Sequence, residues 1–360
     1  MVALEKDVLV VFVPPQGRGP ARGGDHRPAH LEAGDGVFEG TAGVLTPATQ
    51  QPATTGPSLQ DNQDHPPDGQ LNPSHSPHPF QDSLFSLPHK CPALNVRDRV
   101  QEWMSIGTDS LTLEVIKSGV KLMLAGVPPP HHPQNFGKVS EEEWKLLQDL
   151  LEKGVIRQLT QLEFAKTRVW TPIFATPKKE QGTFRLITDL RHINLHLNTP
   201  KFRQDTWATV MEALELNDPK WAVKVDLKDY FHHLAIHPHS QRWIRLKAGE
   251  MGFQFLCLPF GLQSSPYWCH LLAKAVLAHL RPQQYLVVWY VDDILVLGQD
   301  PSELSEKLLN LLTLFNRLGL RVNVPKSVLV PCQRIEFLGL DIDLVARSVS
   351  IPAEQLVGLN

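Results

Sequence analysis

The fold is decided by residues 287–297, which read Val287-Val288-Trp289-Tyr290-Val291-Asp292-Asp293-Ile294-Leu295-Val296-Leu297. Two adjacent carboxylates interrupt a run of β-branched and aromatic residues, and this pattern predicts a strand, a two-residue turn and a second strand. Desolvation and mutual repulsion oppose the ionisation of two neighbouring aspartates unless a cation lies between them. We expect Mg²⁺ there; an ordinary Asp-Asp hairpin turn is the alternative if this stretch is taken alone.

A second run upstream also breaks at carboxylates, and it reads Val223-Lys224-Val225-Asp226-Leu227-Lys228-Asp229-Tyr230-Phe231. If its strand lies beside the first pair, three carboxylates meet at the ends of neighbouring strands. Such an arrangement suits a two-metal phosphoryl-transfer site, in which both cations contact the attacking and leaving oxygens.

Composition restricts the class of protein. The chain has 360 residues, 42% hydrophobic and 20% charged, as in a globular protein that also carries some disordered sequence. Its four cysteines are far apart and form no CxxC pair, which favours a reducing compartment over a zinc site or a disulfide framework. The formal net charge of −3 means that a nucleic acid would have to be recognised by local basic patches.

Targeting and membrane signals are not found in the sequence. The apolar run Val8–Val13 is too short for a signal-peptide core, and no run of about 18 apolar residues occurs. We therefore expect a soluble intracellular protein, cytoplasmic or nuclear, without a membrane partner.

The chain divides into four regions by composition. Residues 14–90 hold 13 of the 30 prolines and little aliphatic periodicity, so residues 1–94 are predicted to be disordered. The histidines in that region are too scattered to form a metal site. Residues 95–138 are expected to be a helical lead-in and linker, 139–345 the main folded domain, and 346–360 a tail.

Helices and strands alternate in the main domain in an α+β pattern. Ser140 to Glu143 form a capping box for a helix that stops at Gly154. Residues 170–177 and 184–190 predict a hairpin. Residues 165–203 contain eight Lys or Arg and two acidic residues, which gives a local charge of 8 − 2 = +6. A solvated basic face is the ordinary explanation, but cations on a hairpin tip can also close over a triphosphate.

The remaining motifs follow in order along the chain. A strand end and turn, Leu258-Pro259-Phe260-Gly261-Leu262-Gln263-Ser264-Ser265-Pro266, leads into a helix over 267–280 with Ser265 as its expected N-cap. A second helix is predicted over 302–318, ending at Gly319. Lys326 comes next, and Phe337-Leu338-Gly339-Leu340 predicts a short apolar hairpin.

These blocks, in this order and spacing, resemble the fingers and palm of a retroelement reverse transcriptase. The resemblance rests on the Arg185–Asn194 stretch, the Asp226 run, the LPFGL..SP stretch, Tyr290-Val291-Asp292-Asp293 and Phe337-Leu338-Gly339, and covers about residues 140–345. The sequence most resembles the reverse transcriptases of DIRS-type retrotransposons, and gypsy-type and hepadnaviral enzymes are related to these. The resemblance implies an RNA-directed DNA polymerase with an antiparallel palm sheet and packed helices, which uses deoxynucleoside triphosphates and a primer on an RNA or DNA template.

The resemblance also implies roles for individual residues. Asp226, Asp292, Asp293 and the Leu227 carbonyl would hold two Mg²⁺ ions, for which Mn²⁺ can substitute, and Lys326 would be the general acid toward pyrophosphate. The triphosphate would be clamped by Lys178 and Arg185. The nucleotide and template surface would include Asp229, Tyr230, Phe231, Phe260, Gly261 and Gln263, and Phe337 to Gly339 would grip the primer end.

Two departures from the family pattern matter. An ungapped alignment makes Phe231 the steric gate against a ribose 2′-hydroxyl and puts Tyr230 where relatives have a small residue; a one-residue gap would make Tyr230 the gate instead. The chain also ends at Asn360, with little room for a thumb and none for RNase H, so a protein partner could supply them. The alternative function is therefore a catalytically weak, thumbless relic that binds nucleic acid or protein.

The run His232-His233-Leu234-Ala235-Ile236-His237-Pro238-His239 suggests a metal site at first sight. If it were a strand, His233 and His237 would stand about 13 Å apart, too far to share one ion. Structural or solvent-facing roles are expected for these histidines.

Overall fold

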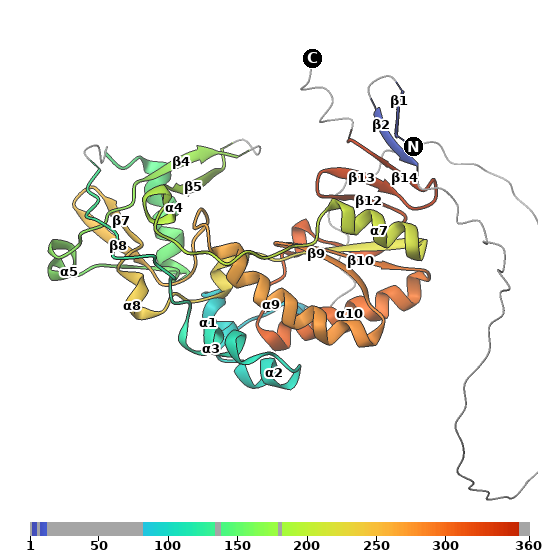
Figure 1. The fold of residues 1–360 in the computed structure, drawn as a ribbon, viewed down its shortest axis with the longest axis horizontal. Coiled ribbons are helices and arrows are strands. Elements are labelled where there is room, and N and C mark those ends of the chain that lie inside the picture. Colours follow the sequence, from blue (N-terminus) through green and yellow to red (C-terminus); the bar gives the residue numbers. More distant parts are fainter. Residues whose placement is uncertain (1, 6–7, 13–81, 134–137, 179–181, 353–360) are drawn as a thin grey trace, which may run out of the picture. The chain divides into compact units, whose positions relative to one another are not determined.

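The structure is a computed structural model that describes residues 2–5, 8–12, 82–133, 138–178 and 182–352 (Figure 1). The segments Met1–Pro14 and Phe80–Asn360 form one compact unit, which holds all the helices and strands described. Helices and antiparallel strands are mixed along the chain, so the predicted α+β class is confirmed.

The centre of the fold is a four-stranded antiparallel sheet in the order β11-β6-β10-β9. Its strands are β6 (Trp221–Asp226), β9 (Leu286–Tyr290), β10 (Asp293–Gly298) and β11 (Val328–Cys332). The predicted hairpin at residues 287–297 is therefore confirmed as β9 and β10. The register places Asp293 of β10 opposite both Tyr290 of β9 and Asp226 of β6.

Both faces of this sheet are buried, because its strands are apolar on both sides. Ile294 and Val296 point into one core, against α10 (Pro301–Leu318), while Leu295 and Leu297 point into another. The second core is closed by α7 (Trp207–Asn217) and by the strands β12 (Arg334–Phe337), β13 (Leu340–Asp343) and β14 (Ser348–Ser350), on the other side of the sheet in Figure 1. A sheet covered on both faces is a rigid support for the residues at its strand ends.

The helix α10 shows how local sequence defines an element. Asp300 is its N-cap and accepts hydrogen bonds from the Ser302 and Glu303 amides, and Gly319 ends it in the left-handed conformation at φ 78°. A Cβ at Gly319 would overlap the Asn95 carbonyl oxygen, so glycine also permits the close approach of another segment. The predicted helix over 302–318 is confirmed.

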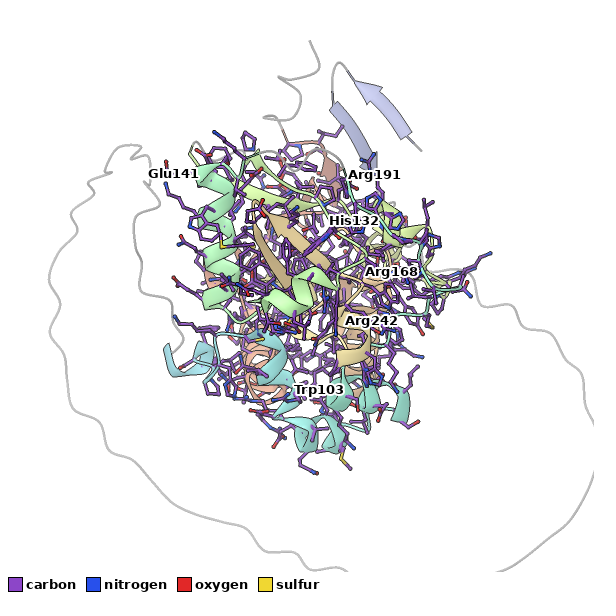
Figure 2. All side chains as sticks on the ribbon, turned by 90° about the vertical axis from the view of Figure 1, so that its left-hand side faces the viewer. Trp103, His132, Glu141, Arg168, Arg191 and Arg242 are labelled. Carbon is purple, nitrogen blue, oxygen red and sulfur yellow. The ribbon has the colours of Figure 1, made fainter. Side chains whose placement is uncertain are left out.

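That other segment is the helical lead-in, made of α1 (Pro92–Arg97), α2 (Val100–Ser105) and α3 (Ser110–Ser118). The Trp103 side chain is fully buried, and its indole Nε1 donates a hydrogen bond to the Leu318 carbonyl oxygen (3.0 Å). In Figure 2, Trp103 lies at the opposite end of the view from Glu141 and Arg191. The lead-in is therefore part of the core beneath α10.

The boundary predicted at residue 95 is too late. A short 3₁₀ helix begins at Asp82, and α1 begins at Pro92, because Cys91, Ala93 and Val96 are apolar residues that the palm core buries. Two strands also lie within the predicted disordered region, β1 (Val2–Glu5) and β2 (Val8–Phe12). The disorder predicted for residues 13–81 lies outside the described residues.

The fingers are built on α4 (Glu141–Glu152). Its predicted capping box is confirmed: the Ser140 hydroxyl accepts from the Glu143 amide, and the Glu143 carboxylate accepts from the Ser140 amide. This helix packs against the hairpin of β4 (Ile173–Pro177) and β5 (Phe184–Thr188), which confirms the predicted fingers hairpin. A three-stranded sheet in the order β3-β8-β7 completes the region, with strands Ile156–Gln158, Met251–Phe255 and Arg245–Ala248.

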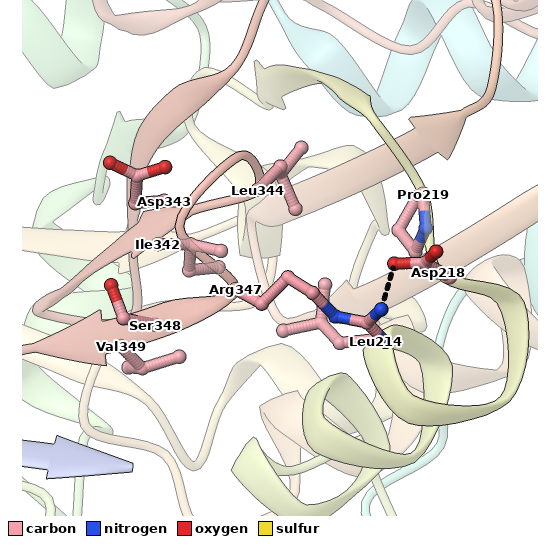
Figure 3. Close-up of a pocket in the computed structure, with 9 residues that line it drawn as sticks. All are labelled: Leu214, Asp218, Pro219, Ile342, Asp343, Leu344, Arg347, Ser348 and Val349. Carbon is pink, nitrogen blue, oxygen red and sulfur yellow. Dashed lines mark ion pairs between the residues drawn. The ribbon is translucent and has the colours of Figure 1, made fainter. Parts of the chain in front are cut away.

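The Phe337-Leu338-Gly339 motif lies in a five-stranded sheet of order β1-β2-β14-β13-β12. The predicted hairpin is confirmed as β12 (Arg334–Phe337) and β13 (Leu340–Asp343), and its turn residues Leu338 and Gly339 both have positive φ. Strand β14 (Ser348–Ser350) follows, and Arg347 just before it forms an ion pair with Asp218 at the end of α7 (3.2 Å; Figure 3). This ion pair ties the hairpin sheet to the central sheet.

Two local expectations are wrong. The N-cap of α9 (Ser265–Leu280) is Ser264, because the Ser265 hydroxyl donates instead to the Pro259 carbonyl oxygen (2.9 Å). The histidine run is not a strand: Tyr230–His233 form a 3₁₀ helix, and Pro238–Gln241 form the short helix α8.

The remaining elements are short and connect the larger ones. They are α5 (Gln161–Ala165), α6 (Arg191–Asn194) and 3₁₀ helices at Asp82–Phe85 (η1), Tyr230–His233 (η2), Arg281–Gln283 (η3) and Val324–Lys326 (η4). Within the described ranges, no helix has the length and apolar character needed to cross a membrane.

The docking of the lead-in on α10 predicts how two substitutions, one of a tryptophan and one of a methionine, change the stability of the protein. Trp103→Ala should lower the free energy of unfolding by about 3–5 kcal/mol, because it removes a fully buried aromatic side chain and its hydrogen bond. Met104 is the next residue in the chain and its side chain is exposed, so Met104→Ala should change the free energy of unfolding by less than about 0.5 kcal/mol. Chemical denaturation of both variants measures this, and equal stabilities would contradict the docking of the lead-in on α10.

Candidate active site

The three aspartates meet where β6 ends and the β9–β10 hairpin turns. Val291 adopts φ 52° in that turn, which is unusual for a β-branched residue, and the next residue is Asp292. The Leu227 amide donates to the Asp292 carbonyl oxygen (2.8 Å), which fixes the end of β6 against the hairpin. Asp226 and Asp293 are directly opposite in the register, and directly opposite residues of an antiparallel pair share one face.

Burial and repulsion make these carboxylates costly to ionise. Burial raises the pKa of Asp226 and of Asp292, and the neighbouring Asp292 charge adds to the shift at Asp226. Burial, with the Asp292 and Asp226 charges, raises the pKa of Asp293 to about 6. At neutral pH the three groups are therefore held together against desolvation and like-charge repulsion.

Polar groups on neighbouring elements partly offset this cost. Lys224 and Lys326 attract the charges of Asp226 and Asp293, and the polar side chain of Asn323 also acts to lower the pKa of Asp226. The backbone is fixed as well, since the Asn323 amide donates to the Asp226 carbonyl oxygen (2.8 Å) and the Asp226 amide donates to the Ser327 hydroxyl (3.0 Å).

Sequence reasoning missed Lys224, Asn323 and Ser327. The period-two rule for strands could have found Lys224, because it lies two residues before Asp226 on the same strand. Asn323 and Ser327 reach the site only through a loop packed beside β6, and their positions in the chain carry no signal for that.

A cleft of about 720 Å³ opens beside these aspartates and extends to the fingers. From the predicted site it brings together Lys178, Arg185, Asp226, Leu227, Asp229, Phe260, Asp292 and Lys326. The cations are exposed and come from two elements, Lys178 and Arg185 from the β4–β5 hairpin and Lys326 from η4. Such a cleft can hold a polyanion between cationic side chains and the aspartates.

Tyr230 does not line the cleft, so its predicted nucleotide contact is wrong. Its ring is buried in the core, and its hydroxyl donates to the Cys269 carbonyl oxygen (3.0 Å). The left-handed conformation of Asp229, at φ 57°, starts the 3₁₀ helix that turns Tyr230 inward. The gapped alignment that would make Tyr230 the gate is therefore also wrong.

Phe231 lies behind another ring instead of at the cleft surface. It is only 9% exposed and packs edge to face on Phe260, with ring centroids 4.9 Å apart. Phe260 lines the cleft and is 49% exposed. His232 supports the same ring from another side, at 5.5 Å between centroids.

Gly261 and Gln263 lie on the loop after Phe260, and Asn194 holds this loop in place. The Asn194 amide group donates to the Gly261 carbonyl oxygen and accepts from the Gln263 backbone amide, both at 2.9 Å. Gly261 has φ 86°, and a Cβ there would lie 3.2 Å from the Thr188 carbonyl oxygen. Both residues are exposed next to the hairpin, outside the 720 Å³ cleft.

Asp229 is held by cations of the protein itself. Its carboxylate is 3.7 Å from the Arg321 guanidinium and 3.9 Å from the Lys153 ammonium, which in turn pairs with Asp149 at 2.7 Å. The predicted contact of Asp229 with a nucleotide therefore competes with these ion pairs.

The histidines of the 3₁₀ helix have structural roles, as expected. Burial lowers the pKa of His233 to about 4, so this imidazole is neutral. Its Nδ1 donates to the Tyr230 carbonyl oxygen (2.9 Å), and its Nε2 accepts from the Arg321 amide (2.9 Å). These bonds fix the helix that carries Phe231.

The donor set at the aspartates suits a hard divalent cation. In the part of the chain that the structure describes, no three His, Cys, Asp or Glu side chains are arranged as a complete metal site. The aspartates nevertheless offer only oxygen ligands, which Mg²⁺ prefers. Burial and neighbouring negative charges raise their pKa values, so a cation between them would offset both the desolvation cost and the repulsion of the ionised carboxylates.

Comparison with known proteins agrees with this geometry. The family model described as "Reverse transcriptase (RNA-dependent DNA polymerase)" matches residues 176–342. The genome polyprotein of Petunia vein clearing virus is 28% identical over 170 residues, 47% of this chain and 8% of its own length. Protein P of duck hepatitis B virus (strain China) is 26% identical over 184 residues, 49% of this chain and 23% of its own length. The chain therefore spans less than a quarter of these relatives.

Solved structures share the fold. The foamy viral protease-reverse transcriptase in complex with an RNA/DNA hybrid has a TM-score of 0.55 at 19% identity, covering 78% of this chain and 38% of that one. The foamy viral protease-reverse transcriptase dRH in complex with double-stranded DNA has a TM-score of 0.53 at 19% identity, covering 76% of this chain and 49% of that one. Residues 176–342, which match the reverse transcriptase family model, hold the four strands of the central sheet and the three aspartates at its strand ends.

Proposed function

We propose that this chain is the RNA-directed DNA polymerase domain of a retrotransposon-like element, of DIRS or gypsy type. It adds deoxynucleotides to a primer 3′-hydroxyl on an RNA or DNA template. The observation that carries the proposal is that Asp226 and Asp292 line one cleft together with three cationic residues, Lys178, Arg185 and Lys326. Two solved structures that share the fold are complexes with double-stranded DNA and with an RNA/DNA hybrid, which supports a nucleic-acid partner.

Asp226 and Asp292 would hold two Mg²⁺ ions, with the Leu227 carbonyl and Asp293 as further ligands. When bound, these ions (or Mn²⁺ in their place) lower the cost of the charge that develops on the attacking and leaving oxygens. Side chains of the cleft would bind the triphosphate and transfer the proton. Arg185 makes forked contacts to the triphosphate, Lys178 adds a point charge, and the Lys326 ammonium donates a proton toward the leaving pyrophosphate.

The same proposal includes the location of the protein in the cell and a protein partner. We expect an intracellular protein, cytoplasmic or nuclear, and a protein partner that supplies a thumb or RNase H activity. The alternative is a domain that binds nucleic acid or protein but extends no primer.

Primer extension on an RNA template separates these functions. Asp292→Asn and Asp226→Asn should each lower the extension rate by orders of magnitude and leave the fold intact, because each removes a charged ligand from the reacting centre. Glu306→Gln is the matched control, since it neutralises an exposed carboxylate on α10, away from the cleft. Wild-type extension rates in either aspartate variant would refute the two-metal assignment. Primer-template binding by a wild-type protein that extends nothing would establish the alternative.

The raised pKa of Asp293 predicts how stability varies with pH. Its folded-state pKa of about 6 lies above the ordinary 3.8, so the folded protein holds this proton more tightly than the unfolded chain does. Without divalent cations, ionisation of Asp293 therefore costs stability as pH rises from about 4 through about 6. Asp293→Asn should be more stable than wild type at pH 7.5 by about 1 kcal/mol, and this difference should vanish below pH 4.

Asp343→Asn is the control of opposite sign, because hydrogen bonds from the Ala346 amide and Arg334 lower the pKa of Asp343. That variant should lose stability at pH 7.5. Added Mg²⁺ should raise the melting temperature of wild type more than that of Asp293→Asn, since a ligand stabilises the state that binds it. A uniform effect of Asp293→Asn at all pH values would contradict the assigned cause.

Sugar selection should depend on two stacked rings. Because Phe260 is the ring at the cleft surface and Phe231 supports it, the wall that excludes a ribose 2′-hydroxyl consists of both. Phe260→Ala and Phe231→Val should each raise ribonucleotide use relative to deoxynucleotide use about tenfold, a loss of about 1.4 kcal/mol of discrimination. The double variant should add little to Phe260→Ala, because residues in contact do not act independently.

The ratio of kcat/KM for the two nucleotide types measures this selection. Phe174→Ala is the matched control, an exposed phenylalanine on β4 outside the cleft, and should leave the ratio unchanged. If Phe231→Val alone relaxes selection, Phe231 is the gate by itself and the composite wall is wrong.

A further inference from the structure

Two of the four cysteines meet in the interior, although 166 positions separate them in the chain. The Cys91 and Cys257 sulfur atoms are 3.5 Å apart, in hydrogen-bond contact. Cys91 is the N-cap of α1 in the lead-in, and Cys257 follows β8 and pairs as a β-bridge with Ala235. Their relative exposures are 6% and 1%, so the contact lies in the core between the lead-in and the palm.

The surroundings of this pair set one thiol apart from the other. The hydrogen bond from Cys257 lowers the pKa of Cys91 to about 6, against the effect of burial, and backbone amides of α1 and the Arg321 charge act in the same direction. The pKa of Cys257 is raised, by the bond to Cys91 and by burial. One sulfur is thus the better nucleophile and the other is the thiol placed to resolve its oxidised form.

The other two cysteines have different environments. Cys269 is fully buried, and burial raises its pKa; its sulfur faces the Tyr230 and Phe231 carbonyl oxygens. Cys332 lies on β11, where its thiol donates to the Ala222 carbonyl oxygen (3.5 Å). Among the cysteines described, only Cys91 and Cys257 have sulfur atoms in contact.

We propose that Cys91 and Cys257 are a modification site, at which a peroxide converts the thiol pair into a reversible intrachain disulfide. The Cys91 thiolate attacks one oxygen of hydrogen peroxide, the O–O bond breaks, and a sulfenic acid and hydroxide form. The Cys257 sulfur then attacks the Cys91 sulfur, the S–O bond breaks, and the leaving hydroxide takes the Cys257 proton as water. In sum, two thiols are oxidised to a disulfide and one peroxide is reduced to two waters.

The bond would join two parts of the molecule that bear on the cleft. Cys257 is followed directly by Leu258, Pro259 and the cleft-lining Phe260. Near Cys91, the Arg321 guanidinium donates to the His89 and Lys90 carbonyl oxygens (2.9 Å each) and lies 3.7 Å from Asp229. A disulfide there would clamp the lead-in to the cleft wall, and it would restrict the unfolded chain by closing a long loop.

The test uses the full chain and does not depend on polymerase activity. Purified protein is treated with hydrogen peroxide, remaining thiols are blocked with iodoacetamide, and peptides are analysed by mass spectrometry without reduction. Trypsin releases Cys91 in residues 91–97, while residues 248–274 hold both Cys257 and Cys269, so a second cleavage with chymotrypsin separates these two. We expect residues 91–97 joined to the Cys257 peptide, a melting temperature several degrees higher than in the reduced protein, and reversal of both by dithiothreitol.

Variants define the pair. Cys91→Ser and Cys257→Ser should each abolish the linked peptide and the rise in melting temperature, whereas Cys332→Ser should retain both. The wild-type peptide map decides the proposal even if a variant does not fold. Wild-type protein in which Cys91 and Cys257 are both alkylated, carry sulfinic or sulfonic acids, or are linked to Cys269 or Cys332 would overturn it.

Discussion

The structure depends on holding like charges together at the end of a buried sheet. Asp226 and Asp293 are directly opposite across β6 and β10, and Asp292 occupies the turn between β9 and β10. Burial raises the pKa of all three carboxyls, and neighbouring carboxylate charges add to the shift at Asp226 and Asp293, so their ionised forms are costly in the protein alone. The rest of the domain supplies enough packing to keep the carboxylates in place despite that cost.

That packing comes from both sides of the sheet. Alternate residues of β10 enter two separate cores, one closed by α10 and one by α7 and the β12–β14 strands. The lead-in extends the first core by placing Trp103 under the end of α10. The segment before the family match is therefore part of the support for the site, although it contributes no side chain to the aspartate cluster.

The cleft combines two kinds of wall. Exposed cations of the β4–β5 hairpin and of η4 line the same cleft as the aspartates, and such charges can bind a polyanion. The aromatic wall is more than one ring thick, because Phe260 lines the cleft and the less exposed Phe231 packs edge to face on it. His232 also contacts the Phe260 ring and lines the cleft. A substitution at Phe231 therefore acts on the cleft through Phe260, because the Phe231 ring packs on the ring that lines the cleft.

The sequence by itself determined the elements and much of the site. Hydrophobic alternation, the capping box at Ser140 and the glycine after α10 were enough to predict the hairpin, α4 and α10, because these signals are local. Asp226, Asp292, Lys178, Arg185 and Lys326 were found as motif residues and lie on one cleft. Only the tertiary structure decided which way Tyr230 and Phe231 turn, since the left-handed Asp229 and the core contacts set their direction. It also brought Cys91 to Cys257 and Trp103 to Leu318. Contacts between residues so far apart in the chain arise from packing, which leaves no periodic signal in either segment.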